Sequence, residues 1–184
     1  MMTALLTSAQ FLKAVARRVG QASAWLVVLL VLTVVIDVIS RRFIVLGSTK
    51  LQDLEWHFHA ALFLLSLGYA YVEGEHVRID VLHTRFGPKV IAAIEIAGAA
   101  LFVVPFCLIV LYYGYNFVER SFMLDEGSAS QTGLPHRWII KSMLLLGFLT
   151  LLAAALGIIA ESIAILRGAK RPEDPHADHQ EVGL

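Results

Sequence analysis

Long apolar runs alternate with short polar segments along this chain. A helix needs about 20 apolar residues to cross the hydrocarbon core of a bilayer. Runs of that length are predicted over residues 22–43, 54–73, 89–118 and 138–166. Each run is bounded by charged, Gly or Pro positions, which end or begin helices. The pattern therefore predicts an all-α membrane protein, with a membrane domain over residues 22–168 that contains four transmembrane helices.

The segments that flank this domain have a different character. The apolar side chains between residues 8 and 20 fall on one helical face, which carries Phe11, Leu12, Val15 and Val19. Lys13 and Arg17 fall on the opposite face. This pattern is typical of an amphipathic helix lying in the membrane interface, which we expect over residues 1–21. The tail over residues 169–184 is polar and contains Pro, so we expect it to be disordered.

Composition supports the membrane class. Hydrophobic residues make up 58% of the 184 residues and charged residues only 16%, whereas soluble domains contain about 25% charged residues. With 15 basic and 15 acidic residues the formal net charge is zero, so the charge gives no indication of nucleic-acid binding. The expected partners of such a hydrophobic chain are membrane lipids. The single cysteine, Cys107, rules out an intramolecular disulfide and a Cys-based metal site.

The distribution of basic residues predicts the orientation in the membrane. Nine lie in the N-terminal segment, the second connection and the tail: Lys13, Arg17, Arg18, Arg78, Arg85, Lys89, Arg167, Lys170 and Arg171. Six lie on the other side: Arg41, Arg42, Lys50, Arg120, Arg137 and Lys141. Because cytoplasmic segments carry the excess of Lys and Arg, both termini are predicted to be cytoplasmic.

Ionisable residues inside the spans are candidate functional groups. Asp37 lies one helical turn before Arg41, and a local ion pair would account for it. Glu95 lies about two turns into the third span, with no opposite charge one turn away. Two interpretations of Glu95 stay open. It is either a functional residue, or a structural one that hydrogen-bonds to a neighbouring helix or extends its side chain to the membrane boundary.

The chain lacks the sequence signatures of a complete transporter or an enzyme. It has no nucleotide-binding glycine motif and no Glu-x-x-His helix pair. It also has no internal repeat and no pair of broken helices, which mark the pathway of many carriers. These features favour a non-catalytic accessory subunit without a cofactor over a free-standing channel or transporter.

Haem binding is an alternative function from another class. His57 or His59, at the start of the second span, and His136, before the fourth, fall on the same side of the membrane. Two histidines from facing helices can ligate one haem iron. The chain would then be a cytochrome-type membrane anchor.

The connection between the second and third spans carries an ordered pattern. From residue 76 to 81, polar His76, Arg78 and Asp80 alternate with three apolar residues. On an extended backbone these classes point to opposite sides. The pattern predicts a segment docked against protein or lipid headgroups, and a solvated loop is the alternative.

Two motifs resemble a known family. The first contains Leu54-Glu55-Trp56-His57, then Ala60-Ala61-Leu62-Phe63-Leu64, and His76-Val77-Arg78-Ile79-Asp80-Val81 after the second span. The second is Thr132-Gly133-Leu134-Pro135-His136-Arg137-Trp138, followed by Lys141. Together they resemble the small membrane subunit of TRAP transporters, the DctQ-like family, over roughly residues 20 to 165.

The resemblance implies an inner-membrane protein that works with a large multi-span TRAP subunit and a periplasmic solute-binding protein. In that family the large subunit holds substrate and sodium, and the small one braces it and helps receive the loaded binding protein. The expected solute is a small organic acid. Candidate structural and interface residues are Glu55, Trp56, His76, Arg78, Asp80, Glu95, Pro135, Arg137 and Trp138. No catalytic, cofactor-binding or metal-binding residue is expected.

Overall fold

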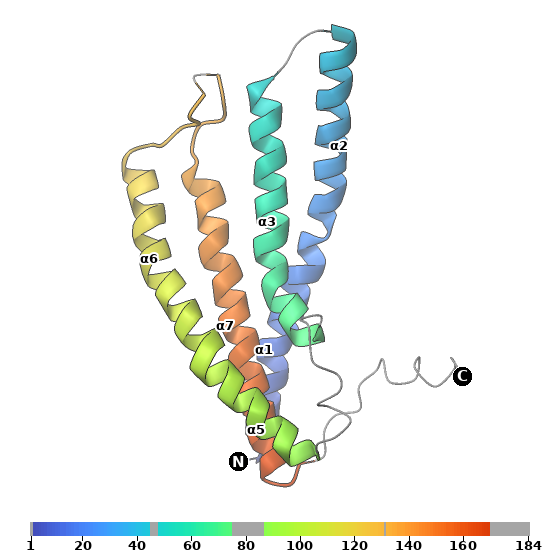
Figure 1. The fold of residues 1–184 in the computed structure, drawn as a ribbon, viewed down its shortest axis with the longest axis vertical. Helices are drawn as coiled ribbons and strands as arrows, with labels where there is room; N and C mark the ends of the chain where they lie inside the picture. The colour runs from blue at the N-terminus through green and yellow to red at the C-terminus, as the bar shows by residue number, and fades with distance from the viewer. Residues whose placement is uncertain (1, 45–47, 75–86, 131, 170–184) are drawn as a thin grey trace, which may run out of the picture.

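A computed structural model describes residues 2–44, 48–74, 87–130 and 132–169, and every regular element in these ranges is helical (Figure 1). The helices are α1 (Met2–Ser23), α2 (Trp25–Ile39), α3 (Thr49–Glu73), α5 (Pro88–Gly98), α6 (Val104–Met123) and α7 (Trp138–Leu166). Two π-helical turns extend them, η1 (Ser40–Ile44) after α2 and η2 (Ala99–Val103) between α5 and α6. The predicted all-α fold is confirmed for the described residues.

Two pairs of helices follow one another with little interruption. Only Ala24 separates α1 from α2, and its backbone N–H still donates to the Gly20 carbonyl at 3.2 Å. The helix from Pro88 to Met123 continues through η2, just before Pro105. Because proline has no N–H to donate, the regular ladder is interrupted there, which accounts for an irregular turn at this point.

Helix α7 lies at the centre of the bundle and contacts α1, α3, α5 and α6 (Figure 1). Glycines let α3 and α7 approach closely. A Cβ atom on Gly147 would lie 2.5 Å from the carbonyl oxygen of Leu64, and one on Gly68 would lie 2.8 Å from that of Thr150. Small residues at helix contacts are typical of membrane bundles, where close van der Waals packing drives association.

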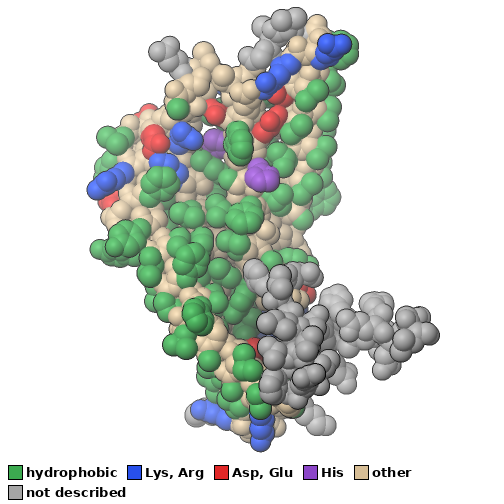
Figure 2. Space-filling model, viewed as in Figure 1, with side chains coloured by type: hydrophobic (Ala, Val, Ile, Leu, Met, Phe, Trp, Pro, Cys, Tyr) green, Lys and Arg blue, Asp and Glu red, His purple; other side chains and the backbone are tan. Residues whose placement is uncertain are grey.

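The buried apolar core lies between α3, α6 and α7. Cys107, Phe148 and Leu151 form its centre, and Cys107 is completely buried. Outside this core many large apolar side chains are exposed. Figure 2 shows hydrophobic side chains across the middle of the bundle, whereas most charged side chains gather towards its two ends. This distribution is expected of a protein whose middle part is surrounded by the hydrocarbon core of a lipid bilayer.

The prediction of four transmembrane helices is confirmed only in part. Among the described residues, three stretches are long and apolar enough to cross a membrane: Leu5–Phe43, Pro88–Met123 and Trp138–Leu166. The predicted second span does form a helix, α3, which has 25 residues. It is less apolar than the others because Lys50, Asp53, Glu55, His57 and His59 crowd its first turns.

The N-terminal helix forms, but it differs from the expected interfacial helix. It joins α2 in one long apolar stretch, and it packs against α3 and α7 through the buried residues Ala9 and Ala16. Lys13 and Arg17 turn toward the bundle and pair with acidic residues there. Phe11, which the sequence pattern places on the other face, is 67% exposed. Lys13 and Arg17 therefore have acidic partners on distant helices, which the local sequence pattern does not identify.

Candidate functional site

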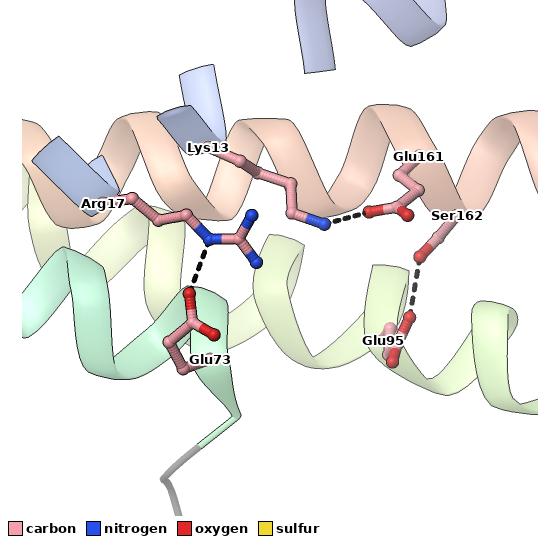
Figure 3. A network of polar contacts seen from close by, with 6 residues as sticks. All are labelled: Lys13, Arg17, Glu73, Glu95, Glu161 and Ser162. Carbon is pink, nitrogen blue, oxygen red and sulfur yellow. Dashed lines mark hydrogen bonds and ion pairs between the residues drawn. The ribbon is translucent and has the colours of Figure 1, made fainter. Parts of the chain in front are cut away.

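Polar side chains join four helices at the end of the bundle where α1 begins. We call Lys13, Arg17, Glu73, Glu95, Glu161 and Ser162 the α1 network (Figure 3). Lys13 Nζ lies 2.5 Å from Glu161 Oε2, and Arg17 Nε lies 2.5 Å from Glu73 Oε1. These pairs connect α1 to α7 and to α3. Since the side chains of Glu73 and Glu161 are largely buried, both pairs are better shielded from water than ordinary surface pairs.

Glu95 extends the α1 network to α5. Its carboxylate oxygen Oε2 accepts a hydrogen bond of 2.9 Å from the hydroxyl of Ser162 on α7. Of the two interpretations left open by the sequence, this geometry matches a hydrogen bond to a neighbouring helix. This hydrogen bond joins α5 to the C-terminal part of α7.

At the opposite end, the loop over residues 124–137 is tied to the start of α3. Asp53 Oδ2 accepts a hydrogen bond of 2.9 Å from the backbone N–H of Leu134. The hydroxyls of Thr49 and Thr132 lie 2.6 Å apart. Two residues 81 positions apart in the sequence, Asp53 and Leu134, thus join α3 to the connection between α6 and α7.

The same loop is also closed on itself. The Ser128 N–H donates to the Leu134 carbonyl at 2.9 Å, and the Arg137 N–H donates to the Glu126 carbonyl at 2.8 Å. Asp125 and His136 both have positive φ angles, 43° and 60°, which are uncommon for residues other than glycine. The His136 ring nitrogen Nδ1 lies 2.7 Å from Asp125 Oδ1. The described residues of this loop therefore form a defined structure.

Electrostatics favour the charged forms of two acids in this region. The backbone hydrogen bond from Leu134, assisted by Ser128, lowers the pKa of Asp53 below its ordinary value. The hydrogen bond from Lys141 lowers the pKa of Glu126. Lys141 Nζ also lies 3.8 Å from the centre of the Phe117 ring. Cation–π contact and the ion pair together place Lys141 at the junction of α6, α7 and the loop.

A third polar group lies where the end of α2 faces the start of α3. We call Asp37, Arg41, Gln52 and Glu55 the α2–α3 seam. Arg41 Nη2 lies 2.6 Å from Asp37 Oδ2, which confirms the predicted local ion pair. Asp37 is buried, whereas Glu55 is half-buried.

The remaining sequence candidates are scattered rather than gathered in one site. Trp56 is 73% exposed, and Trp138 packs edge-on against Phe122 with ring centres 5.4 Å apart. Pro135 is exposed, and Arg137 is half-buried at the start of α7. His76, Arg78 and Asp80 lie outside the described residues.

Several residues that connect the helices cannot be identified from the sequence alone: Asp53, Glu73, Glu126 and Glu161. Each lies near an end of a helix, where an acidic residue is ordinary. Their partners come from other helices, so no local spacing could identify them. The basic character of Lys13 and Arg17 is evident in the sequence, but their acidic partners are not.

The histidines named in the haem hypothesis have separate hydrogen-bond partners. His57 Nδ1 lies 2.5 Å from the Asp53 carbonyl oxygen of its own helix, and His136 pairs with Asp125 in the loop. In the ranges that the structure describes, no group of three or more His, Cys, Asp or Glu residues could hold a metal ion. These contacts do not support the haem hypothesis.

The fold and its polar contacts define a class, a helical membrane protein with an apolar middle and internally paired polar ends. A profile of the DctQ component of tripartite ATP-independent periplasmic transporters matches residues 30–164. The match covers more than half of the chain, and the chain belongs to this family, whose members are the small membrane components of TRAP transporters. No match was found among curated proteins or among solved structures.

Membership confirms the resemblance found in the sequence. The family consists of transporter components rather than enzymes, and it works with a large TRAP subunit and a solute-binding protein. The profile matches α3, α5, α6 and α7 and the later part of α2. It ends close to Glu161 and Ser162, and it begins after α1, so the first 29 residues lie outside the match.

Proposed function

We propose that this chain braces the large TRAP subunit in the inner membrane and helps to receive the loaded solute-binding protein. The observation that carries the proposal is the pairing of polar groups at both ends of the bundle. The α1 network joins α1, α3, α5 and α7, and the Asp53–Leu134 hydrogen bond joins α3 to the α6–α7 loop. A bundle fixed at both ends is suited to a static support.

The proposal includes a membrane crossing by α3. At a rise of about 1.5 Å per residue, its 25 residues extend over about 37 Å, which is longer than a hydrocarbon core of about 30 Å. It packs along α7, which is itself apolar enough to span. Its polar first turns would then lie at the headgroups, and residues 54–73 would cross the membrane.

The proposed orientation places both termini in the cytoplasm, on the basis of the nine-to-six distribution of basic residues. The loop over residues 124–137 and the start of α3 would then face the periplasm. The internal hydrogen bonds of this loop support a role in receiving the binding protein, because a preformed surface loses little conformational entropy on binding. Residues 76–80, including Arg78 and Asp80, would organise a cytoplasmic connection.

The proposed solute and its coupling rest on analogy with the family alone. We infer that the large subunit holds the substrate and sodium, and that the solute is a small organic acid. This chain contributes support and docking rather than a pathway.

Reconstitution in liposomes tests the proposal. The chain alone should take up no organic acid, whereas the chain together with the large subunit and the binding protein should take it up when a sodium gradient is applied. Omitting only this chain from the complete mixture should abolish uptake. Sodium-driven uptake by the isolated chain would contradict the proposal and favour a free-standing transporter.

A further inference from the structure

The α2–α3 seam holds two acidic side chains and one basic side chain. Arg41 pairs with Asp37, and Gln52 accepts from Arg41 Nη1 at 2.9 Å when its amide oxygen is turned toward the guanidinium. Glu55 lies one turn after Gln52 on α3 and interacts electrostatically with Arg41. One guanidinium therefore serves two carboxylates, and the seam carries one negative charge in excess.

This excess charge has no partner among the described residues. Asp37 Oδ1 and Glu55 Oε1 are both buried and accept no hydrogen bond there. Asp37 is only 4% exposed. The neighbouring basic residues Arg42 and Lys50 are exposed and form no ion pair with either carboxylate in the described part of the chain. An unpaired carboxylate at the edge of a membrane is costly, so a positive charge from outside the chain is expected.

The surroundings of the seam indicate where that charge comes from. Figure 2 shows acidic and basic side chains together over the upper ends of α2 and α3, beside exposed hydrophobic side chains. Val34 and Val38, which flank Asp37 on α2, are exposed, and Trp56, next to Glu55, is 73% exposed. A polar group with apolar neighbours matches the contact surface of a membrane helix better than that of a soluble protein.

We propose that the α2–α3 seam binds a Lys or Arg side chain on a membrane helix of the large TRAP subunit. Glu55 is the contacting carboxylate, because its side chain is partly exposed whereas Asp37 is buried against Arg41. The arriving cation brings the seam to two positive and two negative charges. This inference rests on the proposed function, since it names the chemistry by which the large subunit is recognised.

Charge-neutralising variants separate recognition from folding. Glu55→Gln removes the excess charge and keeps the size of the side chain. In the isolated subunit this change should leave the thermal unfolding midpoint unchanged or raise it, because a buried unpaired charge is lost. In detergent-purified complexes, however, it should lower the recovery of the large subunit on the order of tenfold. The matched control is Glu119→Gln, an exposed acid on α6, which should leave recovery unchanged.

Charge reversal gives a second readout. Glu55→Arg should prevent assembly, and replacing one Lys or Arg of the large subunit by Glu should restore it. Full recovery of the large subunit with Glu55→Gln would overturn the inference. A second outcome would also overturn the inference. If sodium raised the unfolding midpoint of the isolated subunit and Glu55→Gln abolished that effect, the excess charge would be neutralised by a bound sodium ion. If the unsubstituted chain itself fails to recover the large subunit, the proposed function fails instead.

Discussion

Lys13 on α1 forms an ion pair with Glu161 on α7, although the two residues are 148 positions apart. Both side chains are largely buried, with 22% and 16% of their surface exposed. The pair attaches the N-terminal helix to the central helix of the bundle. Arg17 repeats the arrangement one turn later, where it pairs with Glu73 at the end of α3. Together these two contacts make α1 part of the bundle.

Breaking the Lys13–Glu161 pair should destabilise the isolated subunit. Lys13→Met or Glu161→Gln each leaves the partner without its counter-charge in a largely buried site. We expect each substitution to lower the free energy of unfolding by about 1–3 kcal/mol. The double variant should cost less than the sum of the two single variants, because the pair is lost only once. Chemical unfolding in detergent measures all three. Arg18→Met, an exposed change on the same helix, is the control. Strictly additive effects of the two substitutions would show that they do not interact.

Close packing of α3 against α7 predicts a strong effect of one methyl group. Gly147→Ala places a Cβ 2.5 Å from the Leu64 carbonyl oxygen, so the helices must separate. We expect a loss of about 1–3 kcal/mol of stability. Gly98→Ala is the matched control, since a Cβ there meets nothing within 4 Å. Alanine in a helix is favoured over glycine by about 0.5–1 kcal/mol, so this control should be neutral or stabilising. Equal unfolding midpoints for the two variants would contradict the packing argument.

The sequence predicted the helices more accurately than it predicted their contacts. Apolar runs identify the helical stretches that became α2, α3, α5–α6 and α7, because hydrophobicity over about 20 residues is a local property. Local spacing also identified the Asp37–Arg41 pair, one turn apart on the same helix. The contacts of Lys13 with Glu161 and of Asp53 with Leu134 depend on how distant helices pack, and no local pattern encodes them.

The same limit applies at α1. Amphipathic spacing correctly separated Phe11 from Lys13 and Arg17, but the direction of the two faces depends on what α1 packs against. Without Glu73 and Glu161 in view, basic residues are expected to face water or headgroups. The two family motifs identified the family correctly, but they did not indicate which residues form contacts between the helices. His76, Arg78 and Asp80, which carry part of that resemblance, lie outside the described residues.

The attachment of the α6–α7 loop should depend on pH. The folded structure lowers the pKa values of Asp53 and Glu126, so the unfolded chain binds more protons as the pH approaches the ordinary carboxyl range of about 4. The stabilisation is therefore fully present above that range and is lost as the pH falls through the lowered pKa values. Fluorescence of Trp138, which follows the loop, should report the change between about pH 5 and pH 3.

A variant lacking both carboxylates is the control for this pH effect. Asp53→Asn combined with Glu126→Gln should weaken the loop attachment at pH 7 and remove most of the pH-dependent fluorescence change. Asp125→Asn, at an exposed position in the same loop, should keep it. If the double variant retained the full transition, other groups would be responsible.

The distribution of basic residues predicts the topology. Reporters fused after Gly74 and at the C-terminus should give cytoplasmic signals, and reporters near Gly47 and Gly127 should give periplasmic ones. Paired alkaline phosphatase and green fluorescent protein fusions at each point measure this, because the first is active only in the periplasm and the second fluoresces in the cytoplasm. A periplasmic signal from the C-terminus would reverse every proposed side, including that of the loop over residues 124–137.

The connection between α3 and α5 gives a prediction from sequence alone. Arg78 and Asp80 share a face on an extended segment and can hold one another or a neighbouring element. If they organise a buried junction, removing either one leaves an uncompensated charge and costs about 3–5 kcal/mol. If they lie in a solvated loop, each substitution should stay within about 0.5 kcal/mol. We expect Arg78→Ala and Asp80→Ala each to lower the amount of large subunit that co-purifies from detergent.

The tail offers a matched control for these variants, because Glu173→Ala removes a charge from a polar stretch and should leave co-purification unchanged. The unfolding midpoint of the isolated subunit separates two causes of a loss. A lower midpoint together with poor co-purification indicates a junction inside this chain, whereas an unchanged midpoint indicates a contact made directly with the large subunit. Full co-purification with both Arg78→Ala and Asp80→Ala would instead make the segment a simple linker, whose alternating pattern serves neither assembly nor stability.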